Sequence, residues 1–440
     1  MKIPKILRSG SKFHLDKLKT IWSVSLYRNA IYLIVGNVIG AFLGFAFWIL
    51  AARFYTTEQV GLASATIAAM VLMGTISHLG MGIGIVRFLP GAGKQATPMI
   101  NSSFTISTIS SIIISIIFVL GLNIWSPDLL FIKHNIYYFV GFVAFTTATA
   151  LNNIGDNTLI AKRLSEYTTI RTIAFNLIKV ILVVLLAGVL KSYGILSSWG
   201  IGLIMTFLMT VFILIPRTQH NYFPWPRFDL HESFILIKYS IVNNIAVLLW
   251  DIPARILPII VVDILGAANN AYFYIAWTIA TTISLIANSV SMSLFAEGSN
   301  EEADMDTKTI KSLSMIFLVL LPITVVVLIF GGKLLQLFGT DYATNASGLL
   351  DIMTITLFPM AVNQIYISTL RVRNKLMPYV FLSLFVMAIT LIIAYLLMPA
   401  WGLIGAGIGW LIGQTIAATW IIFNQKWLKL LFKQMFSIFS

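Results

Sequence analysis

The chain has 440 residues, of which 58% are hydrophobic and only 10% are charged. Soluble domains carry about 25% charged residues, so this composition excludes an ordinary soluble protein and indicates an all-α polytopic membrane protein. The formal net charge is +13 and the sequence contains no cysteine, which excludes disulfides, zinc–thiolate sites and catalytic thiols.

Uncharged runs of about 20 residues, the length that crosses a hydrocarbon core of about 30 Å, predict the membrane helices in chain order. The clear runs are Ala30–Ala52, Met99–Leu122, Gly194–Pro216, Ile264–Ala296, Ser312–Gly332, Ile352–Leu370, Leu376–Trp401 and Gly402–Gln425. Weaker runs with polar or charged residues lie near 60–86, 136–158, 169–190 and 238–264. The sequence therefore predicts about twelve transmembrane helices.

The basic segment 1–29 precedes the first apolar run. It is too long and too basic for an ordinary signal peptide, and no A-x-A-like cleavage site follows the run, so we expect a retained anchor. Alternating sides from a cytoplasmic N-terminus places most of the 29 Lys and Arg residues in the cytoplasm, Arg171 among them. This positive-inside bias predicts a multi-pass protein of the cell membrane with both termini cytoplasmic, and it accounts for the positive charge without nucleic acid. Lys179 and Arg255 are the two bases left at membrane depth.

The longest internal polar stretch, 217–234, predicts a cytoplasmic linker between two halves. These are an N-terminal bundle at 30–216 and a C-terminal bundle at 235–425, followed by a basic tail at 426–440. A shift of roughly 210 residues superimposes the order of six hydrophobic runs in each half. An even number of helices per half predicts parallel six-helix bundles, related by a pseudo-two-fold axis around a central cavity.

The stretch "LWDIPARILP" places charges and prolines inside an apolar run. Asp251 and Arg255 are four residues apart on one helical face, in the favourable order for an intrahelical pair. Pro253 and Pro258 each free a backbone carbonyl, which is tolerated at membrane depth where it lines a cavity or finds another partner. Both interpretations stay open: a neutralised pair at a protein interface, or a functional site that lines a cavity.

Lys179 lies about half-way along its predicted helix and has no acid three or four residues away. Pairing with Asp156 or Asp351 across the bundle is one expectation, and extension of the side chain toward an interface is another. Asn243, Asn244 and His78 are also polar groups in membrane segments, for which helix-to-helix hydrogen bonds and ligand contacts are alternatives.

Glycines at Gly405, Gly409 and Gly413 follow the spacing of small residues at helix contacts. They are therefore predicted to pack helices rather than to form a dinucleotide fingerprint, which would need a preceding strand in a soluble unit.

The first hairpin, "ILAARFYTTEQVGLASATIAAMVLMGTISHLGMGIGIVRFLP", resembles the opening of the polysaccharide flippases of the multidrug/oligosaccharidyl-lipid/polysaccharide exporter superfamily. Arg53, Glu58 and Gly61 match the Ala-Arg end, the acid and the glycine of that family, although Thr56 and Thr57 replace its usual Gly-Pro. The end of the next predicted helix also matches the family's Leu-Gly and Arg-Phe-Leu-Pro, through Leu79, Gly80, Arg87 and Pro90. In the second half, Ala271 stands where the family has a glycine before two aromatic residues.

This resemblance implies a transporter, not an enzyme, that moves a polyprenyl-diphosphate-linked oligosaccharide to the outer leaflet by alternating access. It implies no cofactor, no metal and no catalytic residue. Its expected partners are the lipid-linked oligosaccharide and membrane lipids, while a proton or sodium coupling ion and contact with a polysaccharide polymerase or glycosyltransferase stay open. The implied substrate-binding residues are Arg255, Lys179, Asp251, Trp250, Asn243 and Asn244. The implied gate or headgroup contacts are Arg53, Arg87 and His78.

Two other functions are weighed against a flippase. A multidrug extruder of the same superfamily needs acids for cations, and the first three predicted spans contain none within their apolar runs. A membrane-embedded glycosyltransferase or polysaccharide polymerase belongs to a different class, and the short predicted external loops leave little room for its substrate platform. Both arguments favour the flippase.

Overall fold

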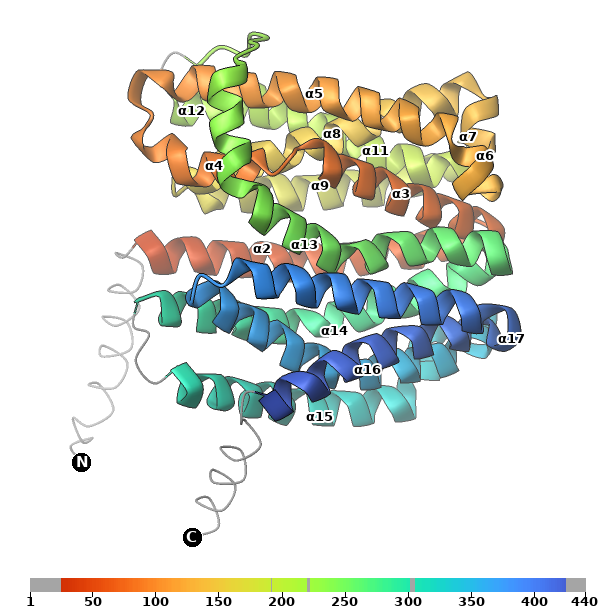
Figure 1. Cartoon of the computed structure of the whole chain (residues 1–440). Helices are drawn as coiled ribbons and strands as arrows, with labels where there is room; N and C mark the ends of the chain where they lie inside the picture. Colours follow the sequence, from red (N-terminus) through yellow and green to blue (C-terminus); the bar gives the residue numbers. More distant parts are fainter. Residues whose placement is uncertain (1–24, 191, 220–221, 301–304, 425–440) are drawn as a thin grey trace, which may run out of the picture.

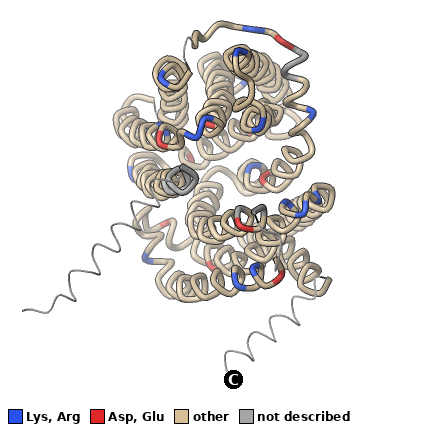
Figure 2. Tube along the Cα trace, turned by 90° about the vertical axis from the view of Figure 1, so that its left-hand side faces the viewer, with Lys and Arg blue, Asp and Glu red and all other residues tan. Residues whose placement is uncertain are grey.

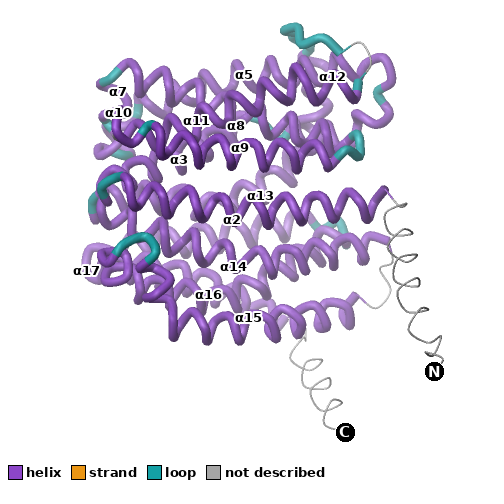
Figure 3. Tube along the Cα trace, turned by 180° about the vertical axis from the view of Figure 1, so that it is seen from behind, coloured by secondary structure: helices purple, strands orange, loops and turns teal. Residues whose placement is uncertain are grey.

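The computed structural model describes residues 25–190, 192–219, 222–300 and 305–424. Within these ranges the chain is built from helices and loops, with no strand (Figure 3). The predicted basic segment 1–29 lies mostly, and the tail 426–440 wholly, outside them. The principal helices are α2 (Ser25–Phe54), α3 (Thr57–Ser77), α4 (Met81–Phe88), α5 (Ala96–Leu120), α8 (Ile136–Ala161), α9 (Ser165–Leu185), α11 (Ser192–Met209), α13 (Leu230–Leu265), α14 (Ala267–Asn300), α15 (Met305–Gln336), α16 (Thr340–Val372) and α17 (Leu376–Asn424).

Short helices complete the described chain. They are η2 (Leu89–Gly91), η3 (Gly93–Gln95), α6 (Leu122–Trp125), η4 (Pro127–Leu129), α7 (Phe131–His134), α10 (Ala187–Leu190), the π-helical turn η5 (Thr210–Leu214) and α12 (Ile215–Thr218). The π-helical turn ends two residues before Pro216, whose missing N–H and bulky ring interrupt the regular hydrogen-bond ladder.

Ten helices of the described chain are long and apolar enough to cross a membrane, or eleven when the bent pair α7–α8 counts as one span. The protein is therefore an all-helical, multi-pass membrane protein, as the composition predicts. The expected count of about twelve is not confirmed: it would be reached only by counting the bent pair as a span and the two halves of α17 separately.

Helix α17 is a hairpin of two antiparallel arms. Its backbone leaves the helical region at Gly402, with φ 55° and ψ −138°, a conformation that is accessible to glycine. A Cβ atom on Gly405, Gly409 or Gly413 would lie 2.6, 2.5 or 2.2 Å from atoms of the first arm. The prediction that these glycines pack helices is confirmed, and the predicted runs on either side of Gly402 correspond to the two arms.

The helices run side by side in two groups (Figure 1). Helices α3 to α12 form the upper group in that view and α14 to α17 the lower group, with α2 and α13 between them. Helix α2 packs mainly on α9, and α13 packs on α17, α3 and α4. We call the end at which α2 begins and α17 ends the terminal end, and the opposite end the far end.

The predicted linker 217–234 is shorter in the structure, because α12 ends at Thr218 and α13 already begins at Leu230. The segment between them is held against the start of α5. Asn101 donates a hydrogen bond to the carbonyl of Phe223 at 2.8 Å, and Ser102 exchanges hydrogen bonds with the backbone of Asp229 at 3.0 and 3.1 Å. These contacts anchor the linker at the terminal end.

Candidate functional site

Asp251 and Arg255 lie in the middle of α13, which continues as a helix through Pro253 and Pro258. Asp251 is exposed and Arg255 is half-buried, and the two charges interact. Arg255 also interacts electrostatically with the hydroxyl group of Tyr274 on α14. The pair is thus accessible on one side and borders α14 on the other.

Lys179 is buried in a cage of aromatic rings instead of pairing with an acid. Its Nζ atom lies 4.1 Å from the ring centre of Trp199, 4.8 Å from that of Phe175 and 5.1 Å from that of Phe47. Only 3% of the residue is exposed. A desolvated cation over a ring gains about 2 kcal/mol or more, and several faces converge here. The expected pairing with Asp156 is wrong, since that acid has another partner.

A row of aromatic rings leads from this cage to α13. The ring of Trp199 lies 6.3 Å from that of Trp48 on α2, and Trp48 lies 4.7 Å from Tyr274. Tyr274 in turn interacts with Arg255. The structure therefore connects the two bases, which come from different predicted halves, through one continuous set of side chains.

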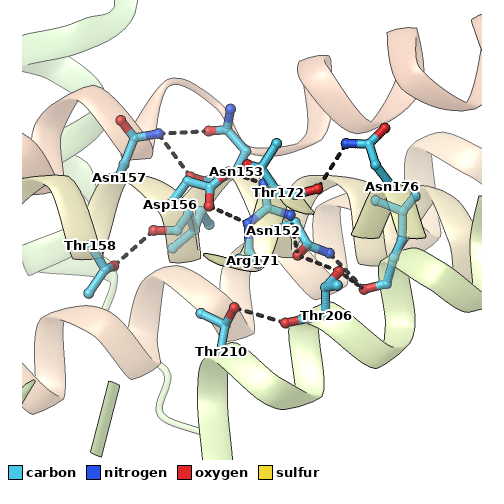
Figure 4. Close-up of polar contacts among 12 residues, drawn as sticks. Asn152, Asn153, Asp156, Asn157, Thr158, Arg171, Thr172, Asn176, Thr206 and Thr210 are labelled. Carbon is cyan, nitrogen blue, oxygen red and sulfur yellow. Dashed lines mark hydrogen bonds and ion pairs between the residues drawn. The ribbon is translucent and has the colours of Figure 1, made fainter. Parts of the chain in front are cut away.

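Asp156 of α8 pairs with Arg171 of α9 (Figure 4). The guanidinium donates two hydrogen bonds to the carboxylate, Nε–Oδ1 at 2.5 Å and a second to Oδ2 at 2.6 Å, and another to Asn152 at 3.1 Å. Thr206 of α11 donates to the same Asn152 oxygen at 3.4 Å. Two parallel hydrogen bonds make this the geometry of a strong charge-assisted pair.

Arg171 is the residue that sequence reasoning missed. Helix α9 begins at Ser165, so Arg171 lies inside the helix, and it is only 8% exposed. Its expected place on the cytoplasmic side stays a prediction. The apolar run near 169–190 starts four residues after the helix begins, so the sequence alone places Arg171 at the edge of the span. The sequence does carry a signal for this pair. Asp156 and Arg171 are separated by similar numbers of residues from the turn near Arg163, whose φ is 59°, so a helical hairpin brings them together.

The other residues implied for substrate binding lie along α13. Trp250 is partly buried and packs on an apolar cluster that includes Ala246 and Ala287. Asn243 and Asn244 are half-buried. A Cβ atom on Gly80 would lie 2.9 Å from Cβ of Asn244, so Asn244 is at the crossing of α13 with the α3–α4 turn.

His78 and Arg87 occupy different environments in this region. His78 is buried at the end of α3, and its Nδ1 accepts a hydrogen bond from the backbone N–H of Gly80 at 3.1 Å. Leu79 and Gly80 both have positive φ values, 51° and 76°, so this bond stabilises a sharp break before α4. Arg87 is exposed in the last turn of α4, at the terminal end of the molecule.

Arg53 joins α2 to the C-terminus of α15 at the far end. It donates hydrogen bonds to the carbonyls of Leu337 at 2.9 Å and Gln336 at 3.0 Å. The last carbonyls of a helix lack intrahelical donors and carry a partial negative charge. The Arg53 guanidinium supplies the missing donors to these carbonyls and offsets their partial negative charge.

Two further contacts join helices at the far end, and the first of them crosses between the two groups. Asn270 of α14 donates to the carbonyl of Gly61 at 2.8 Å and to Oγ of Ser64 at 3.0 Å. Asp263 at the end of α13 accepts from Oγ of Ser126 at 3.1 Å and from the backbone N–H of Asp128 at 3.2 Å. With the Arg53 bonds, we call these the far-end contacts.

A family model described as "Polysaccharide biosynthesis protein" matches residues 26–296, more than half of the chain. The chain belongs to this family. A second model, described as MatE, matches residues 241–396. The relationship expected from the first hairpin is confirmed.

One curated relative is named "Putative O-antigen transporter" and comes from Shigella flexneri. It is 25% identical over 184 residues, which are 41% of this chain and 42% of the relative. The match thus spans less than half the length of the relative.

Two solved structures share the fold over nearly the whole chain. An inward-facing multidrug resistance MATE family transporter has a TM-score of 0.70 at 14% identity, covering 92% of this chain and 99% of that one. The lipid II flippase MurJ in an inward closed conformation has a TM-score of 0.68 at 15% identity, covering 93% and 91%. The expected superfamily and helical fold class are confirmed.

Proposed function

We propose that this protein is a flippase, which moves a polyprenyl-diphosphate-linked oligosaccharide from the cytoplasmic to the outer leaflet without a chemical step. The observation that carries the proposal is the joining of two membrane-depth bases, Arg255 and Lys179, by a row of aromatic rings. A diphosphate needs cationic donors, and bases are kept at membrane depth where they serve a function. Sugar rings pack on aromatic faces such as those in the row. The relatives named for O-antigen and lipid II support this class of cargo.

We propose an orientation in the cell membrane in which the terminal end is cytoplasmic. Figure 2 looks onto this end and shows Lys and Arg residues distributed over it, as expected on the cytoplasmic side. In this orientation the far-end contacts close the outer side. Release of cargo outward then requires them to separate, which assigns Arg53 a gate role, whereas Arg87 contacts headgroups on the inner side.

Replacement of Arg255 or Lys179 by alanine is expected to reduce glycan export at least tenfold, since a hydrogen bond to a charged group contributes about 1.5 to 3 kcal/mol. Complementation of a flippase-deficient strain measures export, with membrane protein level determined in parallel. Lys94→Ala serves as the matched control because Lys94 is exposed at the terminal end. Full export by both variants would rule out the cationic site. Drug resistance without any effect on glycan would favour the extruder.

A disulfide across the far end is expected to stop transport reversibly. The side chains of Ser64 and Asn270 touch at 3.0 Å, and the native sequence has no cysteine, so the double variant Ser64→Cys/Asn270→Cys carries only the introduced pair. Oxidation should lower export at least tenfold, because the two helices can no longer part, and reduction should restore it. Each single variant controls for the loss of the hydrogen bond. Unchanged export by the fully cross-linked protein would contradict opening at this end.

A further inference from the structure

The two arms of α17 enclose a groove that plays no part in the site described above. It has a volume of about 720 Å³. Its lining residues are Tyr366, Pro378, Phe381, Leu382, Leu384, Phe385, Ala388, Ile416, Ala417 and Trp420. Apart from the tyrosine hydroxyl and the tryptophan N–H, these side chains offer only carbon atoms.

The groove follows from the shape of the hairpin. At the far end the arms touch through Gly405 and Gly409, where an added Cβ would meet backbone atoms at 2.6 and 2.5 Å. Toward the terminal end the arms diverge (Figure 1). Tyr366 of α16 lies at the base of the resulting wedge, 6.5 Å from the ring of Trp420. Small residues close one end of the hairpin and bulky residues keep the other end apart.

The rim of the groove faces outward. Phe381 is 67% exposed, Trp420 54% and Phe385 43%. An apolar patch of this kind marks a surface that contacts membrane or a ligand, and the surrounding helices cross the membrane. Hydrocarbon chains are therefore the material whose chemistry matches the groove.

Basic residues lie at the mouth of the groove, in the turn between α16 and α17. Arg373 and Lys375 are exposed there. Arg373 contacts Asp306 at 3.3 Å and also interacts electrostatically with Tyr366 at the base of the wedge. Arg371, in the last turn of α16, lies over the ring of Phe295 at 4.5 Å. Three bases thus stand at one end of the groove, and among the described residues Asp306 pairs with one of them, Arg373.

We propose that this groove is a binding site for an anionic phospholipid, with a hydrocarbon chain between the arms of α17 and the phosphate at Arg373 and Lys375. A basic cluster beside an apolar channel at the end of membrane helices has the chemistry that recognises anionic headgroups. The charge at the mouth selects an anionic lipid over a neutral one with the same chains. The site is independent of the proposed flippase function and of the Arg255 region.

Native mass spectrometry of the detergent-purified protein tests the proposal with added phosphatidylglycerol and phosphatidylcholine. Phosphatidylglycerol is expected to be retained at least about tenfold more, since each base near a phosphate adds to the attraction. The double variant Arg373→Ala/Lys375→Ala should lose this preference while still binding chains. Ala388→Trp, or Ile416→Trp if the first variant does not fold, should fill the groove and lose both lipids.

Lys94→Ala and Ile329→Trp are the matched controls, at an exposed base of the terminal end and at a side chain of α15 that is 66% exposed. Both should bind lipid like the native protein. Equal retention of the two phospholipids by the native protein, or an intact preference in the double variant, would overturn the proposal. Displacement of phosphatidylglycerol by an equimolar polyprenyl phosphate would overturn it as well, by assigning the groove to a different lipid.

Discussion

Replacing Asp156 by alanine is expected to lower the free energy of unfolding by about 3 to 5 kcal/mol, because it leaves the buried guanidinium of Arg171 without its counter-charge. The carboxylate accepts two hydrogen bonds from Arg171, at 2.5 and 2.6 Å, and the Arg171 side chain is only 10% exposed. The remaining bond to Asn152 does not neutralise the charge. Equilibrium unfolding in mixed micelles measures the change.

The double variant Asp156→Leu/Arg171→Met separates a charge effect from a packing effect. An apolar pair of similar volume often replaces a buried ion pair at little cost, so most of the lost stability should return. Asp128→Ala is the control, since Asp128 is exposed and its side chain should contribute no more than about 0.5 kcal/mol. A loss below about 1 kcal/mol for Asp156→Ala would show that the pair contributes little to stability.

Replacing Gly61 by valine is expected to separate α3 from α14 at the far end. A Cβ atom at this position would lie 1.7 Å from the carbonyl oxygen of Ala267 and 2.5 Å from its carbon. No backbone atom can remain so close, so the far-end contact between Asn270 and Gly61 must break. Overpacking costs about 1 to 3 kcal/mol, enough to shift the population toward the separated form by roughly fivefold to more than a hundredfold.

A single cysteine at Ser64 reports this separation, because Ser64 is fully buried in the native contact and no other cysteine reacts. Its labelling by a water-soluble maleimide should accelerate at least about fivefold in the Gly61→Val background, in line with the overpacking cost. Gly332→Val is the matched control, since Gly332 also lies in a helix and an added Cβ would meet nothing within 4 Å. An unchanged labelling rate with Gly61→Val would refute the close contact.

The candidate site was only partly accessible to sequence reasoning. The charges of Asp251 and Arg255 stand out from their apolar surroundings, so their position inside one membrane helix could be predicted. The aromatic cage of Lys179 could not, because Phe47, Phe175 and Trp199 come from three different helices. Only Phe175, four residues before Lys179 on α9, lies within a local window, and one ring does not indicate a cage.

The sequence by itself determined the membrane-spanning class, the all-helical fold and the family relationship. Burial in lipid imposes long apolar runs that are visible locally, and the hairpin of α17 follows from two such runs on either side of Gly402. Only the tertiary structure decided which groups meet. Asn270 finds Gly61 across 209 positions of sequence, and Asp156 takes Arg171 rather than Lys179. Such choices depend on the depth and rotation of each helix against its neighbours, which packing sets and hydropathy does not record.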